Sequence, residues 1–418
     1  MGDQGVRVSG LWIQDWVGRI TTSFGRRLFW NWEWDQNQYP NLDNEIEKLK
    51  AKGVSVLGYI NPNLNIEGDL FKEGEKLGYF VKNSTGQTYI TDFGEFYCGS
   101  IDLTNPDAYT WYKDEVIKKN MIELGLSGWM ADFGEYMPTD AVFYNGRSGE
   151  VMHNAWPALW AQINYDAVKE AGKLGEIVYW MRAGYTGSQR YNTLTWAGDQ
   201  LVDWSLDDGL ASVIPAALSL GMSGHGLHHF DIGGYTSLFG IRRTEELLLR
   251  YAELATFTPV MRTHEGNRPS ENWQVYSSND TLQAVARLVN IFVTLSNYTK
   301  TVVKENSEFG IPTQRPLFMH YENCSICYAI KYQYLYGPDL LVAPVFESQK
   351  DKWTVFLPDD EWVFLWNGKE YQGEEYHEVN ASLGQIPVFY RKRSKWAPDF
   401  RKMNLMEHNT RHNVHEDL

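Results

Sequence analysis

The chain has 418 residues, of which 43% are hydrophobic and 22% charged, so it can bury a large core and lacks the composition of a disordered protein. Its formal net charge of −15 argues against a nucleic-acid or anionic-membrane partner. It has no apolar stretch long enough to span a bilayer and no apolar signal region at its start, and we therefore expect a soluble, cytoplasmic protein.

Short apolar runs alternate with helical periods through the first 300 residues, which is the pattern of βα units. The predicted strands are residues 8–14, 54–61, 100–103, 128–132, 177–182, 194–199, 224–231 and 258–264. The predicted helices include residues 42–53, 105–125, 156–171, 210–220 and 245–256. Eight such strands predict an α/β fold, a (β/α)8 TIM barrel over residues 1–312.

The composition changes after about residue 312, where short alternating runs are separated by turn residues. The predicted strands of this part are residues 317–321, 329–334, 340–345, 353–356, 362–365 and 388–390. We interpret residues 313–398 as a C-terminal β-sandwich. The polar, charged residues 399–418 are predicted to be a disordered tail.

Polar residues recur at the ends of the predicted barrel strands, the face on which such barrels place their chemistry. They are Asp15, Asp132, Arg182, Asp199, Asp231 and His264. Two of them, Asp132 and Asp199, each end a short apolar run that contains tryptophan. Paired carboxylates of this kind suit glycoside hydrolysis, in which one attacks the anomeric carbon and the other protonates the leaving oxygen. The alternative is that each acid only caps a helix or binds backbone amides.

The cysteines and histidines suggest no metal or cofactor site. Three cysteines do not make a disulfide framework, and the Cys324-Ser-Ile-Cys327 spacing is half of a metal or redox motif with no second pair. On a predicted strand, we interpret it as incidental. Three histidines, His225, His228 and His229, could bind zinc in principle. We expect them instead to position sugar hydroxyls or carboxylates, and the chemistry to need no cofactor.

Long stretches of the chain resemble glycoside hydrolase family 31, the retaining α-glycosidases, and within it most closely the bacterial sulfoquinovosidases. The resemblance runs from about residue 11 to residue 400. The matching segments are Trp129-Met-Ala-Asp-Phe-Gly-Glu135, Val202-Asp-Trp-Ser-Leu-Asp-Asp-Gly209, Gly224-His-Gly-Leu-His-His229, Asp231-Ile-Gly-Gly-Tyr235 and Met261-Arg-Thr-His-Glu-Gly-Asn-Arg-Pro269. The resemblance implies hydrolysis of α-sulfoquinovosides, the sulfonated headgroups of plant sulfolipid.

The resemblance also implies roles for individual residues. Asp132 matches the nucleophile and Asp199 the acid/base, so Asp132 has to stay ionised while Asp199 stays protonated. Arg182 and His264 match ligands of the hydroxyls of the sugar being cleaved, and Asp231 and Glu135 are expected to contact the substrate beside them. Phe230 departs from the family pattern, in which a small or polar residue is expected before Asp231. A bulky residue at this position is expected to alter the rotamer of the Asp231 side chain.

A sulfonate needs a cation and several hydrogen-bond donors, because burying an anion without them is costly. Arg27 and Trp30, three residues apart in Phe24-Gly-Arg-Arg-Leu-Phe-Trp-Asn-Trp32, match the family's sulfonate ligands, with the register favouring Arg27 over Arg26. Gln14 and Tyr235 match the remaining two positions of that pocket. The partner is therefore predicted to be a small sulfonated glycoside.

Other interpretations remain open at this point. An α-glucosidase or α-xylosidase for neutral sugars would use the same chemistry, and a truncated homologue could bind carbohydrate without turnover. The family normally carries a β-sandwich before the barrel, whereas this sequence begins almost directly at the first predicted strand, so we expect that domain to be missing. The oligomeric state is not determined by the sequence, and a homo-oligomer is compatible with it.

Overall fold

The computed structural model describes residues 5–403 and divides into two compact units. The first unit is Val8–Thr195, and the second unit is Trp196–Leu418 together with Met1–Arg7. Each is described by itself below. No helix among the described residues is long and apolar enough to cross a membrane.

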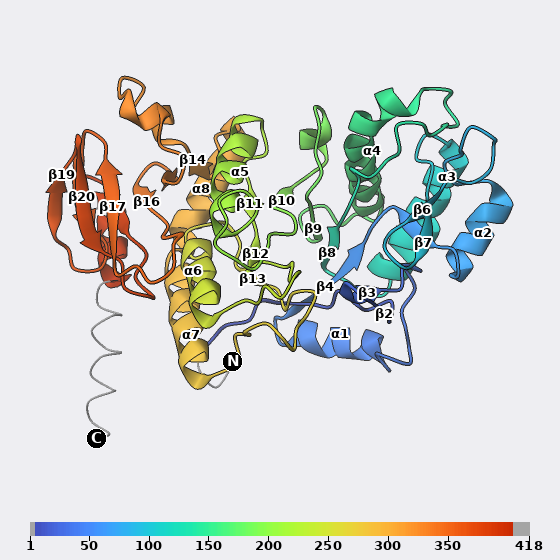
Figure 1. Cartoon of the computed structure of the whole chain (residues 1–418), viewed down its shortest axis with the longest axis horizontal. Coiled ribbons are helices and arrows are strands. Elements are labelled where there is room, and N and C mark those ends of the chain that lie inside the picture. The colour runs from blue at the N-terminus through green and yellow to red at the C-terminus, as the bar shows by residue number, and fades with distance from the viewer. Residues whose placement is uncertain (1–4, 404–418) are drawn as a thin grey trace. The chain divides into compact units, whose positions relative to one another are not determined.

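A parallel sheet forms the centre of the first unit (Figure 1). Its strands, in spatial order, are β1 (Gly10–Trp12), β4 (Ser55–Ile60), β8 (Gly128–Ala131), β9 (Val178–Met181) and β10 (Leu194–Trp196). All four residues of β8 are buried, as expected for a parallel strand covered on both faces. A Cβ atom at Gly128 would lie 2.0 Å from the carbonyl oxygen of Val178, so only glycine fits at this strand contact.

Helices and two small antiparallel sheets surround these strands. The helices are α1 (Leu42–Ala51), α2 (Asp69–Leu77), α3 (Pro106–Trp111), which continues as a wider π-type helix over Tyr112–Ile122, and α4 (Gly149–Glu170). The antiparallel strands are β2 (Arg19–Thr22) with β3 (Gly25–Leu28), and β5 (Asn63–Asn65), β7 (Tyr97–Ser100) and β6 (Ile90–Asp92). The predicted start of α3 is confirmed, because the Asn105 side chain accepts from the Asp107 N–H and Pro106 follows the cap.

The third predicted barrel strand, residues 100–103, is wrong. β4 pairs directly with β8, with Gly58 opposite Trp129, and nothing is inserted between them. The chain before residue 101 instead pairs antiparallel with β5, where Asn63 lies opposite Ser100. A buried hydrogen bond of 2.5 Å from the Ser100 hydroxyl to the Asn63 side-chain oxygen fixes this register. The Ser100–Asn63 contact thus accompanies the pairing of β7 with β5, and a short apolar run in the sequence could not reveal that pairing.

The second unit begins with short strands and four helices. The strands are β11 (His228–His229), β12 (Asp231–Ile232) and β13 (Arg262–Thr263), the last two paired in parallel. The helices are α5 (Val213–Met222), α6 (Glu245–Ala255), α7 (Asn279–Thr294) and α8 (Ser296–Phe309). The predicted strands 224–231 and 258–264 are thus regular over only a few residues each.

Two antiparallel sheets complete the second unit beside helices α6–α8 (Figure 1). Their strands are β14 (Gln314–Arg315), β15 (Tyr334–Tyr336), β16 (Leu340–Val342), β21 (Val388–Arg391), β18 (Glu361–Phe364) and β19 (Glu370–Gln372) in one sheet, and β17 (Lys352–Leu357) with β20 (Glu375–Asn380) in the other.

Three details of the C-terminal part differ from the predictions. Residues 317–321 and most of 329–334 are not strands but lie in a segment of short turns, in which Cys324 and Cys327 form a disulfide. The interpretation of that pair as incidental is therefore wrong. Residues 397–403 are helical with Phe400 and Met403 buried, whereas disorder was predicted from residue 399. The rest of the predicted tail lies outside the described residues.

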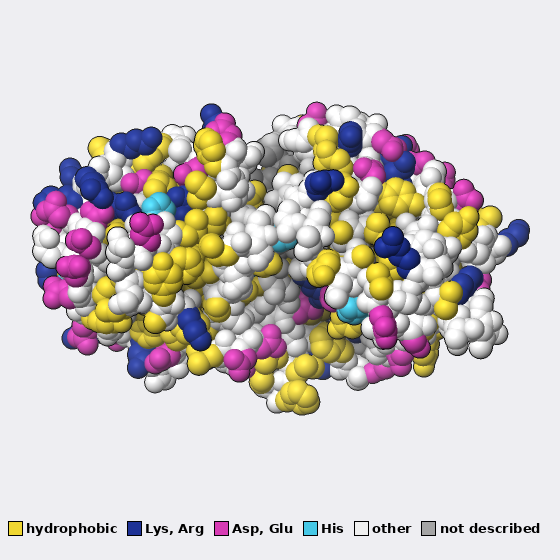
Figure 2. Space-filling view, turned by 90° about the horizontal axis from the view of Figure 1, so that it is seen from above, with side chains coloured by type: hydrophobic (Ala, Val, Ile, Leu, Met, Phe, Trp, Pro, Cys, Tyr) yellow, Lys and Arg dark blue, Asp and Glu magenta, His cyan; other side chains and the backbone are white. Residues whose placement is uncertain are grey.

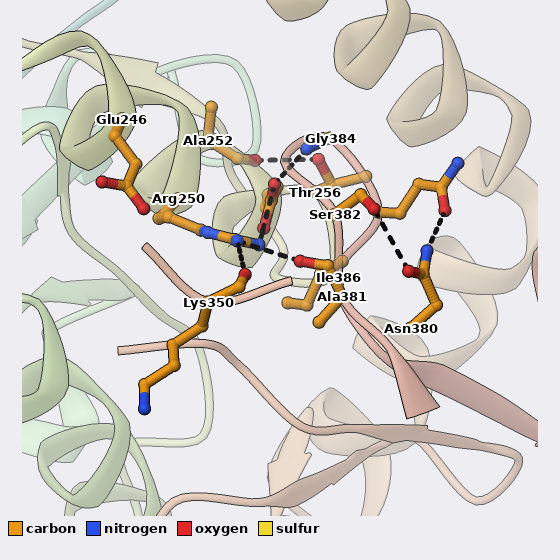
Figure 3. A network of polar contacts seen from close by, with 12 residues as sticks. Glu246, Arg250, Ala252, Thr256, Lys350, Asn380, Ala381, Ser382, Gly384 and Ile386 are labelled. Carbon is orange, nitrogen blue, oxygen red and sulfur yellow. Dashed lines mark hydrogen bonds and ion pairs between the residues drawn. The ribbon is translucent and has the colours of Figure 1, made fainter. Parts of the chain in front are cut away.

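A buried ion pair joins helix α6 to the C-terminal sheets within the second unit (Figure 3). Arg250 and Glu253 lie 3.0 Å apart and are both about 1% exposed. The Arg250 guanidinium donates to the carbonyl oxygens of Lys350 and Ala381, and the Gly384 N–H donates to Glu253. These bonds pair both charges inside the protein and leave Nε of Arg250 without a partner among the described residues.

Charged side chains of both signs are interspersed over the face shown in Figure 2. The net charge of −15 is therefore not gathered into one acidic field on that face. Such a mixed surface keeps a protein soluble without forming a broad basic surface for polyanions.

Candidate active site

Asp132 directly follows strand β8 in the first unit, and its position is set by the backbone. Its N–H donates to the Ile60 carbonyl at 2.8 Å, which extends the pairing of β8 with β4 by one residue. Phe133 then adopts a left-handed backbone conformation, φ 59°, at a cost on the order of 1 kcal/mol. The Phe133 N–H donates to Oδ1 of Asp132 at 2.7 Å. A strained turn thus presents the carboxylate at the strand end.

Two further donors hold the Asp132 carboxylate. The Tyr59 hydroxyl donates to Oδ2 at 2.5 Å, and Nε of Arg182 lies 3.2 Å from Oδ1. The Asp132 side chain is only 10% exposed, so these donors replace the water that an ionised carboxylate would otherwise need. The arrangement fixes the position of the carboxylate, which is what a nucleophile requires.

Tyr59 is a site residue that the sequence prediction missed. It lies on β4, is buried, and also accepts a 3.3 Å hydrogen bond from the Asn61 side chain. Burial and the neighbouring negative charge of Asp132 raise the pKa of the Tyr59 hydroxyl well above its usual value, so it remains a donor. Only the pairing of β4 with β8 brings it to Asp132, and the sequence carries no motif for that contact.

Arg182 is shared between two carboxylates. Its Nη2 lies 2.5 Å from Oε1 of Glu135, and its Nε donates to the same oxygen at 2.7 Å. Burial raises the pKa of Glu135, an effect that Arg182 opposes and Asp132 reinforces. Glu135 thus forms an ion pair that orients Arg182 beside Asp132, and its contact with substrate stays a prediction. The guanidinium also lies 4.6 Å from the Phe133 ring.

Arg27 and Trp30 are brought next to this carboxylate by an aromatic cluster. The Trp30 ring makes edge contacts with Phe93, Phe96 and Phe133 at centroid distances of 4.9–5.1 Å. The Arg27 guanidinium lies 4.9 Å from the Phe96 ring and donates to the Phe93 carbonyl at 3.2 Å. Phe133 follows Asp132 directly in the chain. Its contact with the Trp30 ring therefore links the predicted anion ligands to the predicted nucleophile within the first unit.

The indole N–H groups of Trp30 and Trp32 differ in their hydrogen bonding. The Trp32 N–H donates to the Asn63 carbonyl at 3.0 Å, whereas the Trp30 N–H makes no hydrogen bond to any described residue. The Arg27 guanidinium uses one N–H on Phe93. Trp32 therefore acts in packing, and Trp30 and Arg27 keep donors for another group.

Gln14 and Asp15 follow β1 at the same level of the sheet. Gln14 is partly buried. The Asp15 carboxylate accepts from the Gln38 side chain at 2.8 Å and from the Tyr39 hydroxyl, and it forms an ion pair with Arg19 at 3.2 Å. Asp15 thus ties down the loop that follows β1, and it fixes the path of the chain next to Gln14.

In the second unit, Asp199 lies three residues beyond β10, not at the strand end as predicted. Gly198 before it has φ 83°, and the Thr236 hydroxyl donates to the Asp199 carbonyl at 3.3 Å. Asp199 is exposed, in contrast to the buried Asp132. An acid that exchanges protons with water and with a departing group needs such access.

Asp231 is held by a single direct cation. Strands β12 and β13 place it opposite Arg262, whose Nη1 lies 2.5 Å from Oδ1 of Asp231. The Nε of Arg262 donates to Nε2 of His229 at 3.0 Å, so that imidazole is neutral. Phe230 points to the other face of the strand, where it is buried against Tyr251 of α6. Its bulk therefore does not crowd the Asp231 carboxylate. Arg262 was not assigned a role from the sequence.

His264 and Tyr235 lie together near this pair. Their rings contact edge to face at 4.9 Å, and the Gly266 N–H donates to Nδ1 of His264 at 2.8 Å. Desolvation lowers the pKa of His264 to about 4, with Asp231 opposing and Arg262 reinforcing the shift. At neutral pH the ring is therefore neutral with its proton on Nε2.

The remaining histidines do not form a metal site in the described part of the chain, where no group of three potential ligands is found. His228 is buried, and desolvation followed by His225 lowers its pKa to about 3. His229 is engaged by Arg262.

Family models match almost the whole chain. The glycosyl hydrolases family 31 TIM-barrel domain matches residues 2–302, and the family 31 C-terminal domain matches residues 310–394. The chain belongs to glycoside hydrolase family 31. The predicted fold class, a TIM barrel followed by a C-terminal β domain, and the resemblance to this family are confirmed.

Similar proteins include sulfoquinovosidases. The chain is 57% identical over 400 residues to the sulfoquinovosidase of Escherichia coli K12, covering 96% of this chain and 59% of that protein. It is 51% identical to the sulfoquinovosidase of Agrobacterium fabrum, covering 93% and 58%. A solved family 31 sulfoquinovosidase from E. rectale, in complex with the aza-sugar inhibitor IFGSQ, superposes with a TM-score of 0.95 at 55% identity, covering 96% and 60%. The chain thus spans about three fifths of the length of these relatives.

Proposed function

We propose that this family 31 hydrolase is a retaining α-glycosidase that cleaves α-sulfoquinovosides such as sulfoquinovosyl glycerol. The observation that supports it best is this link within the first unit: a buried carboxylate with three donors, Asp132, lies next to Phe133, which contacts Trp30 of the Arg27–Trp30 pair. A nucleophile linked in this way to an anion-binding pair is compatible with a sugar substrate that carries a negative charge. The identity to two named sulfoquinovosidases supports the same substrate class.

The reaction would proceed in two displacements. Asp132 attacks the anomeric carbon while Asp199 protonates the departing oxygen, so the glycosidic bond breaks as the Asp132 ester forms. Asp199, now ionised, then takes a proton from water, whose oxygen attacks the same carbon and releases Asp132. Two inversions return the α anomer. Retention requires the two carboxyl groups to approach to about 5–5.5 Å during the reaction.

The surrounding residues would bind the sugar and stabilise charge. Arg182 is oriented by Glu135 and donates toward Asp132 and a sugar hydroxyl, and neutral His264 donates through Nε2. Asp231, fixed by Arg262, accepts from a hydroxyl. Each of these bonds is strongest when charge develops at the anomeric centre, which is how binding lowers the barrier.

The sulfonate would be held by Arg27, the Trp30 indole N–H, Gln14 and Tyr235. A guanidinium supplies charge together with planar donors and suits an oxyanion better than a lysine does. A neutral 6-hydroxymethyl group would leave the Arg27 charge without a counterion. That difference would generate the preference for the sulfonated sugar.

Hydrolysis of 4-nitrophenyl α-sulfoquinovoside beside 4-nitrophenyl α-glucoside tests the proposal, with Asp132→Asn as the control. We expect turnover of the sulfonated substrate, abolished in the control. A preference for the glucoside would retain the mechanism and reject the sulfonate assignment, and turnover of neither would reject catalysis by this chain.

Substitution of Arg27 tests the sulfonate pocket directly. Arg27→Ala should lower kcat/KM for the sulfoquinovoside by about 10- to 150-fold, the loss expected for a hydrogen bond to a charged group, and change the glucoside rate little. The adjacent Arg26 is exposed and points to the other face of β3, so Arg26→Ala is the matched control. Equal losses in both variants would contradict the assignment.

A further inference from the structure

The disulfide of the second unit lies in a segment that the proposed function does not use. Cys324 and Cys327 are bonded to each other, with Cα atoms 5.3 Å apart, between β14 and β15. This segment, drawn in orange in Figure 1, projects from the body of its unit. The neighbouring Ile326 and Tyr328 are 41% and 59% exposed. A reagent or partner in solution can therefore reach the segment.

The two sulfurs have unequal surroundings. Cys327 is fully buried in the hydrophobic core of the second unit, whereas Cys324 is only partly buried against that core. The Cys327 N–H also donates to Sγ of Cys324 at 3.2 Å. A donor and solvent contact favour a thiolate, and burial among apolar groups disfavours one. Cys324 is therefore the more accessible sulfur for exchange with a thiol in solution, and Cys327 is the buried one.

The bond contributes little as a crosslink. Only two residues separate the cysteines, and stabilisation by a disulfide grows with the length of the loop that it closes. The turn is already held by backbone hydrogen bonds from Cys324 N–H to the Tyr321 carbonyl and from Cys327 N–H to the Cys324 carbonyl. The Phe318 and Tyr328 rings stack at 4.9 Å across the same segment. The segment should therefore keep its fold when the bond is reduced.

We propose that Cys324 and Cys327 form a thiol–disulfide exchange site for low-molecular-weight thiols of the glutathione type. In oxidation, the Cys324 thiolate attacks the small disulfide, forms a mixed disulfide and releases one thiolate. Cys327 then loses its proton and attacks Sγ of Cys324, which releases the second small thiolate and closes the protein disulfide. Two electrons and two protons pass from the protein dithiol to the small disulfide, which becomes two thiols. The reverse steps reduce the protein.

The test is equilibration of the full chain with mixtures of reduced and oxidised glutathione, followed by alkylation of free thiols and mass spectrometry. We expect the pair to pass from dithiol to disulfide within that range of mixtures. The buried Cys98 is the internal control, because burial raises the pKa of its thiol and it should stay reduced. A pair that stays oxidised in reduced glutathione, or stays reduced in oxidised glutathione, overturns the proposal.

Single variants test the order of attack. In Cys327→Ser a mixed disulfide with glutathione should accumulate on Cys324. In Cys324→Ser the same adduct on Cys327 should form about tenfold more slowly or not at all, because that sulfur is buried. Equal rates, or a faster reaction at Cys327, overturn the assignment of Cys324 as the attacking sulfur. Matching circular dichroism melts show that both variants are folded, and no catalytic activity is needed for any of these readouts.

Discussion

Two buried carboxylates, one in each unit, are stabilised in different ways. Asp132 in the first unit accepts from Tyr59 and the Phe133 N–H and shares Arg182 with Glu135, so its charge is distributed over several donors. Asp231 in the second unit depends on one direct cation, Arg262. A group that must react benefits from several fixed donors, since losing part of one of them leaves the rest in place. A group that is proposed to bind a hydroxyl without forming a covalent bond can rely on a single ion pair.

The largest expected effect is on activity, and it distinguishes the proposed nucleophile, Asp132, from the proposed acid/base, Asp199. Asp132→Ala should lower turnover of 4-nitrophenyl α-sulfoquinovoside by about 10⁴-fold or more, because no other group can form the covalent intermediate. Asp199→Ala should retain the first step, since nitrophenolate leaves without a proton, and should be rescued by azide, which needs no general base. The azide product of the Asp199 variant should be the α anomer, and formation of the α-azide by the Asp132 variant instead would reverse the two roles.

The second prediction concerns stability and tests the comparison itself. Arg262→Met leaves the charge of Asp231 uncompensated and should destabilise the protein by about 3–5 kcal/mol. Arg182→Met should cost less, because Asp132 keeps two other donors. Urea unfolding measures both. The double variant Asp231→Asn/Arg262→Met should recover part of the lost unfolding free energy. Equal losses in Arg262→Met and Arg182→Met would contradict the proposed difference between Asp231 and Asp132.

The third prediction tests the role of Tyr59. Tyr59→Phe should lower kcat/KM by about 10- to 150-fold, the usual value of a hydrogen bond to a charged group. Tyr112→Phe is the matched control, since that hydroxyl is equally buried but donates to the Asn61 carbonyl. An unchanged kcat/KM in Tyr59→Phe would show that the Tyr59 hydroxyl contributes nothing to catalysis and that the residue only packs.

The smallest expected effect is a pH dependence in the second unit. The pKa of His228 is lowered in the folded state to about 3, so below its ordinary value of 6.5 the unfolded chain binds more protons. The stability therefore falls as the pH drops through the range 6.5 to about 3, by up to about 1.4 kcal/mol per pH unit from this residue. His228→Gln should flatten that slope, measured as unfolding free energy at pH 5 and pH 7. His377→Gln, at a more accessible position on β20, should not.

The sequence predicted a catalytic pair and a set of anion ligands, and these roles stay predictions. The position of Asp132 after strand β8 could be predicted because an apolar run ending in an acid marks a strand end. The contacts of Tyr59 and Arg262 could not be predicted, because each depends on which strand pairs with its own and in what register. The same limit explains the wrong third strand and the predicted strands at residues 317–321 and 329–334, where short apolar runs serve turns equally well.

The position of Asp199 and the use of Glu135 show the same division. The sequence placed Asp199 at a strand end, but the strand stops at Trp196 and Asp199 is exposed in an irregular segment after it. It assigned Glu135 to substrate, which stays a prediction, and it did not reveal the ion pair of Glu135 with Arg182. Cytoplasmic location and oligomeric state stay predictions.

The sequence by itself determined the family, the order of strands and helices in outline, and the residue types of the site, because these follow from local patterning and motifs. The tertiary structure alone decided which donors meet Asp132, which cation meets Asp231, and that Cys324 and Cys327 are bonded. Contacts between residues far apart in the chain depend on strand register and burial, and a one-residue change of register would replace every one of them.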